Sequence, residues 1–284
     1  MPPEGSVFAP RKPLSPQLKA GLAITGAIIL LGLLAPWIAP HPWDTISMRT
    51  RFLPPNATYW LGTDEYGRDV LSRLLMGTRL SLAMGVGATA FSLAIGVPIG
   101  LAAGYFRGWI DEALMRAADV LMALPPIMLG LLVLAVTPPA LWKTALAVGF
   151  VYVPQIARLA RSVTLSLANE DFIQAAKARA ESTSYILFRE ILPNAWPPLI
   201  VEASLRVTYA ILLGSALSFL GLGAQPPSSD WGLMISEARS FLDRAPWIAF
   251  APGLAMCLLV IGINLLGDGA RERLDPRLKA RVKA

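Results

Sequence analysis

Few side chains in this 284-residue sequence have the chemistry of a catalytic site. His41 is the only histidine and stands in a proline-rich turn, which argues against a histidine-dependent triad. Cys257 is the only cysteine, so neither a disulfide within the chain nor a cysteine-based metal site can form. The sequence has no Gly-Lys pair and hence no P-loop for nucleotide hydrolysis. A membrane-embedded enzyme would have to use Asp119, Glu202 and Arg206, so we assign no catalytic or metal-binding residue.

Glu202 and Arg206 form the most conspicuous polar pair inside an apolar stretch. A spacing of four residues puts both side chains on one helix face, where their charges can neutralise each other. Pairing lowers the cost of placing either side chain in hydrocarbon. Two interpretations stay open: a packing pair near the membrane interface, or a polar patch on the wall of a pathway.

The stretch from Asp171 to Asn194 is a charged, amphipathic island between long apolar runs. Its pattern predicts two short helices joined by a polar turn. Asn169 or Asp171 can cap the first helix, with Gln174 in capping-box spacing to Asp171. Pro193 is expected to end the second helix, because proline removes a backbone donor.

The turn between these two helices, Glu181–Ser184, offers side-chain acceptors to the free backbone donors of the second helix. Such a stretch fits three surroundings: solvent, lipid headgroups or a partner protein. The residues alone do not choose among them.

Composition places the chain among integral membrane proteins. Hydrophobic residues make up 55% of the sequence and charged residues only 15%, with a mean hydropathy of +0.54. The net charge of +6 comes from basic residues that flank apolar spans, so we expect no nucleic-acid partner but contact with membrane lipid.

The apolar runs predict an all-α protein with six transmembrane helices, since about 20 residues cross a bilayer. A first helix at 20–40 follows a tail at 1–19, and a core of five helices at 80–267 precedes a tail at 268–284. The core spans are 80–104, 120–136, 140–160, 195–223 and 245–267, with a cytoplasmic loop at 161–195. Gly96, Gly100 and Gly104 have the four-residue spacing that lets helix backbones approach closely.

Two polar segments are expected on the other side of the membrane. In 41–79, Thr63 or Asp64 can cap an amphipathic helix, whose apolar stripe from Val70 lies opposite charged residues. We therefore predict a surface helix at the outer interface. A second amphipathic piece, Trp231–Phe241, is predicted to lie on or dip into the bilayer.

Basic residues favour the segments assigned to the cytoplasm by about two to one, as the positive-inside rule requires. An even number of spans then puts both termini, and the loop 161–195, in the cytoplasm.

Besides the stretch 171–194, three pieces of the sequence resemble one membrane-protein family, and they occur in the order expected for it. The chain is similar, over about residues 20–276, to the C-type permease subunit of ATP-binding-cassette (ABC) importers of the dipeptide, oligopeptide and nickel group. The stretch 171–194 resembles the family's signature loop, although Gln174 stands where glutamate is usual and Ala180 where glycine is usual. The matching pieces are Leu61-Gly-Thr-Asp-Glu-Tyr-Gly-Arg-Asp-Val-Leu-Ser-Arg73, Ser218-Phe-Leu-Gly-Leu-Gly223 with Pro226-Pro227 and Trp231-Gly232, and Leu265-Leu-Gly-Asp-Gly-Ala-Arg271 with Leu274-Asp-Pro276.

The resemblance implies a type I importer permease bundle in a bacterial inner membrane, without a cofactor of its own. ATP and magnesium would bind to two separate cytoplasmic ATPase subunits, and an extracytoplasmic binding protein would deliver di- or oligopeptides. A related permease would complete the pathway as a heterodimer. The stretch would act as a coupling helix on the ATPase, through Phe172, Gln174, Ala175, Ala176, Lys177, Arg179, Ala180, Leu192 and Pro193.

The residues suit that task. Phe172, Ala175 and Ala176 are predicted to share a face that permits close approach, with Lys177 and Arg179 at its rim. Glycine at position 180 would permit a positive backbone angle, so Ala180 implies either an ordinary helical turn or strain.

Other cargoes remain open within this architecture, namely nickel complexes, glutathione or oligosaccharides. In another class are a stand-alone secondary transporter and a membrane-embedded enzyme. The sequence shows no inverted repeat typical of the former.

Overall fold

The computed structural model describes residues 15–136 and 138–274, and every regular element in this part of the chain is helical. The prediction of an all-α protein is therefore confirmed for these residues. Parts of the two predicted tails lie outside the described ranges. The helices are α1 (Pro16–Ile38), η1 (Met48–Thr50), α2 (Val70–Phe106), α3 (Gly108–Met122), α4 (Pro126–Leu134), α5 (Leu141–Leu167), α6 (Asp171–Ala178), α7 (Thr183–Tyr185), η2 (Ile186–Ile191), α8 (Leu192–Phe219), α9 (Trp231–Ala238), η3 (Arg239–Phe241) and α10 (Trp247–Leu274).

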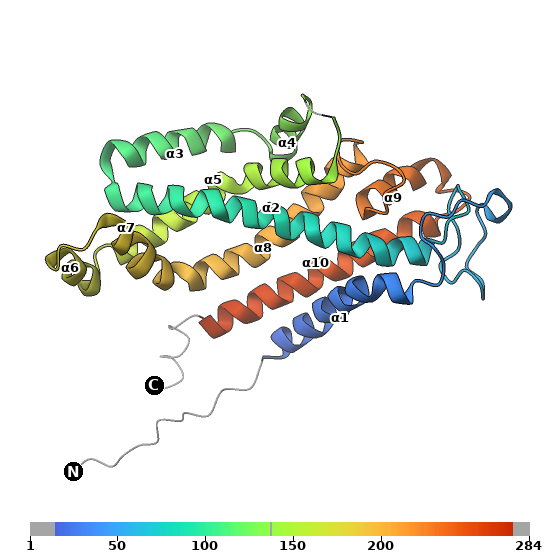
Figure 1. Cartoon of the computed structure of the whole chain (residues 1–284), viewed down its shortest axis with the longest axis horizontal. Helices are drawn as coiled ribbons and strands as arrows, with labels where there is room; N and C mark the ends of the chain where they lie inside the picture. Colours follow the sequence, from blue (N-terminus) through green and yellow to red (C-terminus); the bar gives the residue numbers. More distant parts are fainter. Residues whose placement is uncertain (1–14, 137, 275–284) are drawn as a thin grey trace, which may run out of the picture.

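The long helices α1, α2, α5, α8 and α10 run along one common direction and form an elongated bundle (Figure 1). The short helices α6 and α7 lie at one end of this bundle, and the loops between α1 and α2 lie at the opposite end with α9 nearby. At the second end, the loops between α1 and α2 thus lie near α9, although the two are far apart in the sequence.

Close contact between α2 and α5 depends on the glycine repeat. A side chain at Gly100 would come within 2.3 Å of the Ala157 carbonyl oxygen, and one at Gly96 within 2.8 Å of Ile156 and of the Val153 carbonyl oxygen. The predicted close approach of backbones at these glycines is confirmed.

The predicted count of six spans is not fully reproduced by helix length and composition. Four helical stretches of the described residues are long and apolar enough to cross a membrane, and the bent pair α3–α4 brings the number to five. The stretches are Pro16–Ile38, Val70–Phe106, Thr183–Phe219 and Trp247–Arg273. Helix α5, expected to be the fourth span, is as long but carries Lys143, Arg158 and Arg161, and it packs against α2 and α8 inside the bundle.

The helix predicted in the second half of 41–79 is present only from Val70 onward, where it is the start of α2 and not a separate surface helix, and neither Thr63 nor Asp64 caps it. Helix α2 begins only at Val70, where the Asp69 carboxylate accepts the Ser72 amide at 3.1 Å, and it continues without a break to Phe106. Before it, Gly62 and Gly67 have φ values of 74° and 73°, which a right-handed helix excludes. Residues 61–69 are therefore an irregular, well-packed segment.

The charged residues of this segment are buried and paired with one another. The Asp64 carboxylate accepts Arg68 Nε at 2.6 Å and Arg73 Nη1 at 2.7 Å. Both arginines also reach Glu237 of α9, at 3.2 and 3.1 Å. Burial also raises the pKa of the nearby Glu65 carboxyl. These contacts connect the start of α2 to α9.

The segment Trp231–Phe241 was predicted to lie on or dip into the bilayer. This is wrong for residues 231–234, because these residues of α9 are buried inside the protein. The Trp231 side chain packs with Met234 and with residues of α8 and α10 in a common core. Its indole nitrogen donates to the Leu74 carbonyl at 3.1 Å. A buried indole stabilises this position by burying a large apolar surface while its N–H remains bonded.

Candidate functional site

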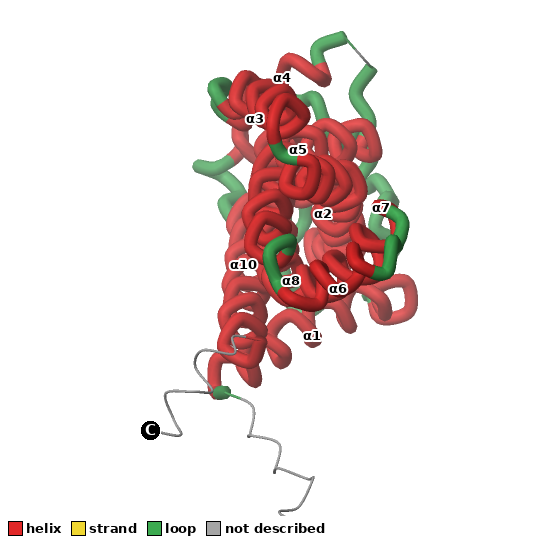
Figure 2. Tube along the Cα trace, turned by 90° about the vertical axis from the view of Figure 1, so that its left-hand side faces the viewer, coloured by secondary structure: helices red, strands yellow, loops and turns green. Residues whose placement is uncertain are grey.

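The segment 168–195 lies at one end of the bundle, where α5 leads through α6, α7 and η2 into α8 (Figures 1 and 2). In the end-on view of Figure 2, α6 crosses the base of the bundle with α7 beside it. Two short helices joined by a turn were predicted here, and α6 and α7 correspond to them. The segment is the most prominent candidate for contact with another protein.

The inner face of α6 is fixed to its own bundle. Ile173 and Ala176 are both fully buried and pack in one core with Ile186 and Ile191 of η2. Val97 and Leu101 of α2 and Ile156 and Ala160 of α5 complete this core. Movement of α6 would therefore act directly on α2, α5 and the start of α8.

The outer face of α6 carries a different set of residues. Phe172 is 37% exposed, and Gln174, Ala175, Lys177 and Arg179 are also exposed. Ala176 was predicted to share the outer face with Phe172 and Ala175, and the structure corrects this. Ala176 is fully buried and packs with Ile173 in the core of its own bundle, so it cannot face a partner.

The predicted capping box at the start of α6 is wrong. Glu170 occupies the N-cap position without a side-chain bond to the helix, and Asp171 is already helical. The side-chain amide of Gln174 donates instead, through Nε2, to the Ala168 carbonyl oxygen at 3.2 Å. A side-chain amide can donate this bond, whereas an ionised glutamate carboxylate cannot.

Ala180 is strained, one of the two possibilities that the sequence left open. Its φ is 58°, in the left-handed region. The Ala180 amide donates to the Lys177 carbonyl at 2.9 Å and the Glu181 amide to the Ala176 carbonyl at 3.2 Å. Together these two bonds form a Schellman motif, which normally has glycine at this position.

The second helix begins as predicted but does not end at Pro193. The Ser182 hydroxyl caps α7 by accepting the Tyr185 amide at 3.3 Å. The chain then passes through the π-helical turn η2 directly into α8. Leu192 is half-buried and Pro193 is exposed in the first turn of α8.

Several polar contacts attach this segment to its neighbours. The Lys177 ammonium lies 5.4 Å from the centre of the Tyr105 ring. Arg107 Nη2 donates to Asn169 Oδ1 at 3.0 Å. Arg179 has acidic partners within its own chain, since Glu181 and Glu190 each lie 3.5 Å away. The two ends of α6 and its flanking residues thus contact the α2–α3 corner and η2.

The predicted Glu202–Arg206 pair is present in α8. Arg206 Nε donates to Glu202 Oε1 at 2.6 Å, and both side chains are half-buried. The Arg206 guanidinium also lies 5.3 Å from the Tyr152 ring centre and 5.7 Å from that of Tyr209. These contacts connect α8 to α5.

Two features near this end were not predicted from the sequence. Tyr185 and Phe188 are exposed aromatic side chains next to α6. In addition, α3 and α5 are joined by the ion pairs Asp111–Arg161 and Asp119–Arg158. The unmatched charges on two neighbouring apolar stretches were a signal that could have indicated these pairs. Among the described residues no cluster of histidine, cysteine or carboxylate side chains could hold a metal ion.

Comparison with known proteins identifies similar chains along almost the whole sequence. Residues 96–280 match the family model described as "Binding-protein-dependent transport system inner membrane component". Residues 19–55 match the "N-terminal TM domain of oligopeptide transport permease C".

Curated relatives are similar over most of their own length. The "Dipeptide transport system permease protein DppC" of Alkalihalophilus pseudofirmus is 40% identical over 98% of this chain and 94% of its own. The "Di/tripeptide transport system permease protein DppC" of Pseudomonas aeruginosa is 41% identical over 91% and 88%. The "Glutathione transport system permease protein GsiD" of Pectobacterium atrosepticum is 45% identical over 80% and 75%.

A solved structure has the same fold. A chain of the MetNI methionine ABC transporter in an inward-facing conformation superposes with a TM-score of 0.60, covering 72% of this chain and 96% of that one. Its sequence identity of 18% supports a common fold alone.

Proposed function

Because the chain belongs to the family of binding-protein-dependent transport system inner membrane components, we propose that it is the permease of an ABC importer for di- or oligopeptides. The observation that carries this proposal is the match to peptide permeases over nearly the full length of both chains. The glutathione relative favours the same cargo class, because glutathione is itself a small peptide derivative.

ATP hydrolysis belongs to separate cytoplasmic subunits in this proposal, which would bind ATP and magnesium. The absence of a P-loop sequence in the chain supports this division. A binding protein would deliver the peptide, in keeping with the family description. A related permease would complete the pathway as a heterodimer. Lysine and arginine are about twice as numerous in the segments assigned to the cytoplasm as in the outer segments, which supports an inner membrane topology with both termini in the cytoplasm.

The outer face of α6 is the proposed contact with an ATPase subunit. Phe172 supplies an aromatic anchor, Ala175 permits close approach, and Lys177 favours an acidic rim on the partner. Arg179 would have to exchange Glu181 and Glu190 of its own chain for such acidic groups. The inner face, through Ile173 and Ala176, would pass the movement of the ATPase to the bundle core.

Two neighbouring alanines provide a sharp experiment. In the assembled transporter, Ala175→Arg is expected to abolish co-purification of the ATPase subunits while the permease itself still accumulates in the membrane. Ala175→Ser keeps the side chain small and is the matched control, which should retain the ATPase. Ala176→Arg should instead prevent stable accumulation of the permease, because position 176 faces the chain's own core. Normal ATPase retention and peptide uptake by Ala175→Arg would refute this docking surface.

The Glu202–Arg206 pair has two candidate roles, packing or lining of a pathway. Its contacts with Tyr152 and Tyr209 favour packing between α5 and α8.

A further inference from the structure

Helix α3 has a hinge-like connection at each end. At its start, Arg107 and Gly108 both have positive φ values, 56° and 57°, and Arg107 has a ψ of −163°, a combination that only glycine adopts readily. Such a conformation is strained for arginine and persists only where the surroundings hold it. At its other end, the axis turns by 91° into α4 across residues 123–125. Movement of α3 requires dihedral changes only at these two short connections.

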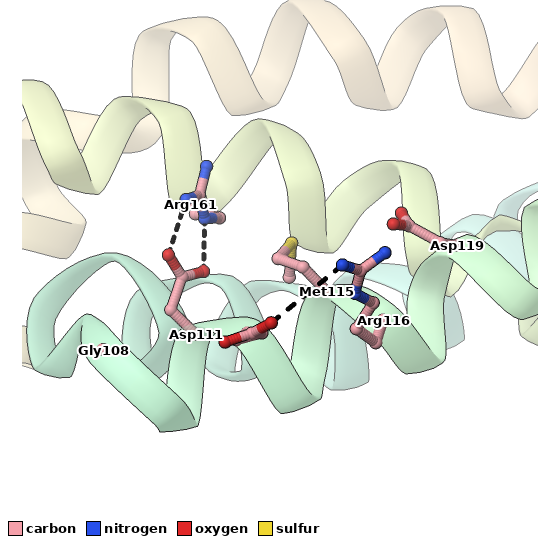
Figure 3. Close-up of a pocket in the computed structure, with 7 residues that line it drawn as sticks. Gly108, Asp111, Met115, Arg116, Asp119 and Arg161 are labelled. Carbon is pink, nitrogen blue, oxygen red and sulfur yellow. Dashed lines mark hydrogen bonds and ion pairs between the residues drawn. The ribbon is translucent and has the colours of Figure 1, made fainter.

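Apolar packing holds α3 weakly. Ala118 is its one buried residue, whereas Trp109 and Val120 are 78% and 70% exposed. By contrast, α2 and α5 interlock through their glycine repeat. An open pocket of about 250 Å³ lies beside α3 and Arg161 (Figure 3). The α3–α5 boundary is therefore much looser than the α2–α5 boundary.

Two ion pairs join α3 to α5 across this boundary. Asp111 binds the Arg161 guanidinium through both carboxylate oxygens, with Nη2 2.5 Å from Oδ2 (Figure 3). About two turns further along α3, Asp119 pairs with Arg158 of α5. Both pairs are partly exposed to the surroundings. Partly exposed ion pairs contribute little to stability, and they can break and form again without leaving an apolar cavity.

The hinge at Arg107 is connected to the proposed coupling helix. Arg107 Nη2 donates to Asn169 Oδ1, just before the start of α6, and Lys177 of α6 lies over the Tyr105 ring near the end of α2. A displacement of α6 would therefore pull on the residue where the strained corner between α2 and α3 is held.

We propose that Asp111, Asp119, Arg158 and Arg161 are positioning residues that hold α3 on α5 in the present state and separate when α6 moves during the transport cycle. This inference rests on the proposed function, because α6 must receive the movement of an ATPase. The α2–α5 pair serves as the fixed frame, and α3 swings between its two hinges.

Distance measurements between spin labels test this inference in the assembled transporter. With Cys257 replaced by serine, labels at Glu112 of α3 and Ser162 of α5 report the moving pair, and labels at Ala94 of α2 and Ser162 report the fixed frame. These three labelled positions are exposed. Trapping the ATPases with ATP and vanadate should shift the Glu112–Ser162 distance and leave the Ala94–Ser162 distance unchanged. An unchanged Glu112–Ser162 distance during ATP-driven uptake would overturn the inference.

The variant Asp111→Asn provides a second, independent measurement. If the Asp111–Arg161 ion pair must separate during the cycle, weakening it should raise the ATPase activity measured without peptide. The expected increase is about two- to fivefold, which corresponds to the free energy of one partly exposed ion pair. The exchanged pair Asp111→Arg with Arg161→Asp should bring this activity back toward the wild-type value. A parallel fall of assembly, uptake and ATPase activity, without rescue, would reduce the pair to a structural contact. If the wild-type permease bound no ATPase subunit at all, the proposed function itself would be refuted. The failure of the further inference and the failure of the proposed function are therefore distinguishable.

Discussion

Replacing Ala180 by glycine should stabilise the end of α6. A left-handed conformation costs a non-glycine residue roughly 1–2 kcal/mol, and glycine loses more backbone entropy on folding, roughly 0.5–1 kcal/mol. Because Ala180 is exposed, removal of its methyl group loses little packing. The net expected gain is about 1 kcal/mol, or about a fivefold change in the equilibrium for local opening.

Hydrogen exchange measures this gain where it occurs. The amides of residues 180 and 181 donate to the Lys177 and Ala176 carbonyls, so both should exchange about fivefold more slowly in Ala180→Gly. Ala178→Gly is the matched control with the opposite sign, because glycine inside an exposed helix costs about 1 kcal/mol. Unchanged or faster exchange in Ala180→Gly would refute the assignment of strain to Ala180.

Three other predictions concern charged residues. Single replacements of Glu202 by Gln and Arg206 by Met should each lower the thermal stability of the complex, and the double variant should lose less than their sum; additive losses would show that the pair is not coupled. Asp230 caps α9 and burial raises its pKa, so Asp230→Asn should keep the cap and preserve stability, whereas Asp230→Ala should cost about 1 kcal/mol; equal effects would refute the capping role. Burial raises the pKa of Glu65 above 4.5, so the stability due to its protonated form is complete below pH 4.5 and is lost as pH rises through the folded pKa; Glu65→Gln should remove this dependence, which melting curves across that range would detect.

Periodic features were predictable from the sequence because regular spacing reports the helix directly. The glycine repeat of α2 indicated a close approach to another helix, which the structure shows to be α5, and the four-residue spacing of Glu202 and Arg206 indicated their pairing. The polar island also indicated α6 and α7.

Features set by tertiary contacts were harder to predict. The stripe around Val70 suggested a surface helix, yet Gly62 and Gly67 prevent helix formation before residue 70, and the neighbouring charges pair with Glu237 more than 160 residues away. Similarly, the three apolar residues Phe172, Ala175 and Ala176 suggested one docking face. Only the position of the core beneath α6 separates buried Ala176 from exposed Ala175.

Photo-cross-linking in native membranes tests the central claim most directly. A benzoylphenylalanine residue in place of Phe172, which is already an exposed aromatic side chain, should form an adduct with an ATPase subunit. The same residue in place of Trp60, which is exposed in the loops between α1 and α2, should form none. An ATPase adduct at position 60, or the lack of one at position 172 in a transporter that imports peptides, would contradict the proposed coupling role of α6.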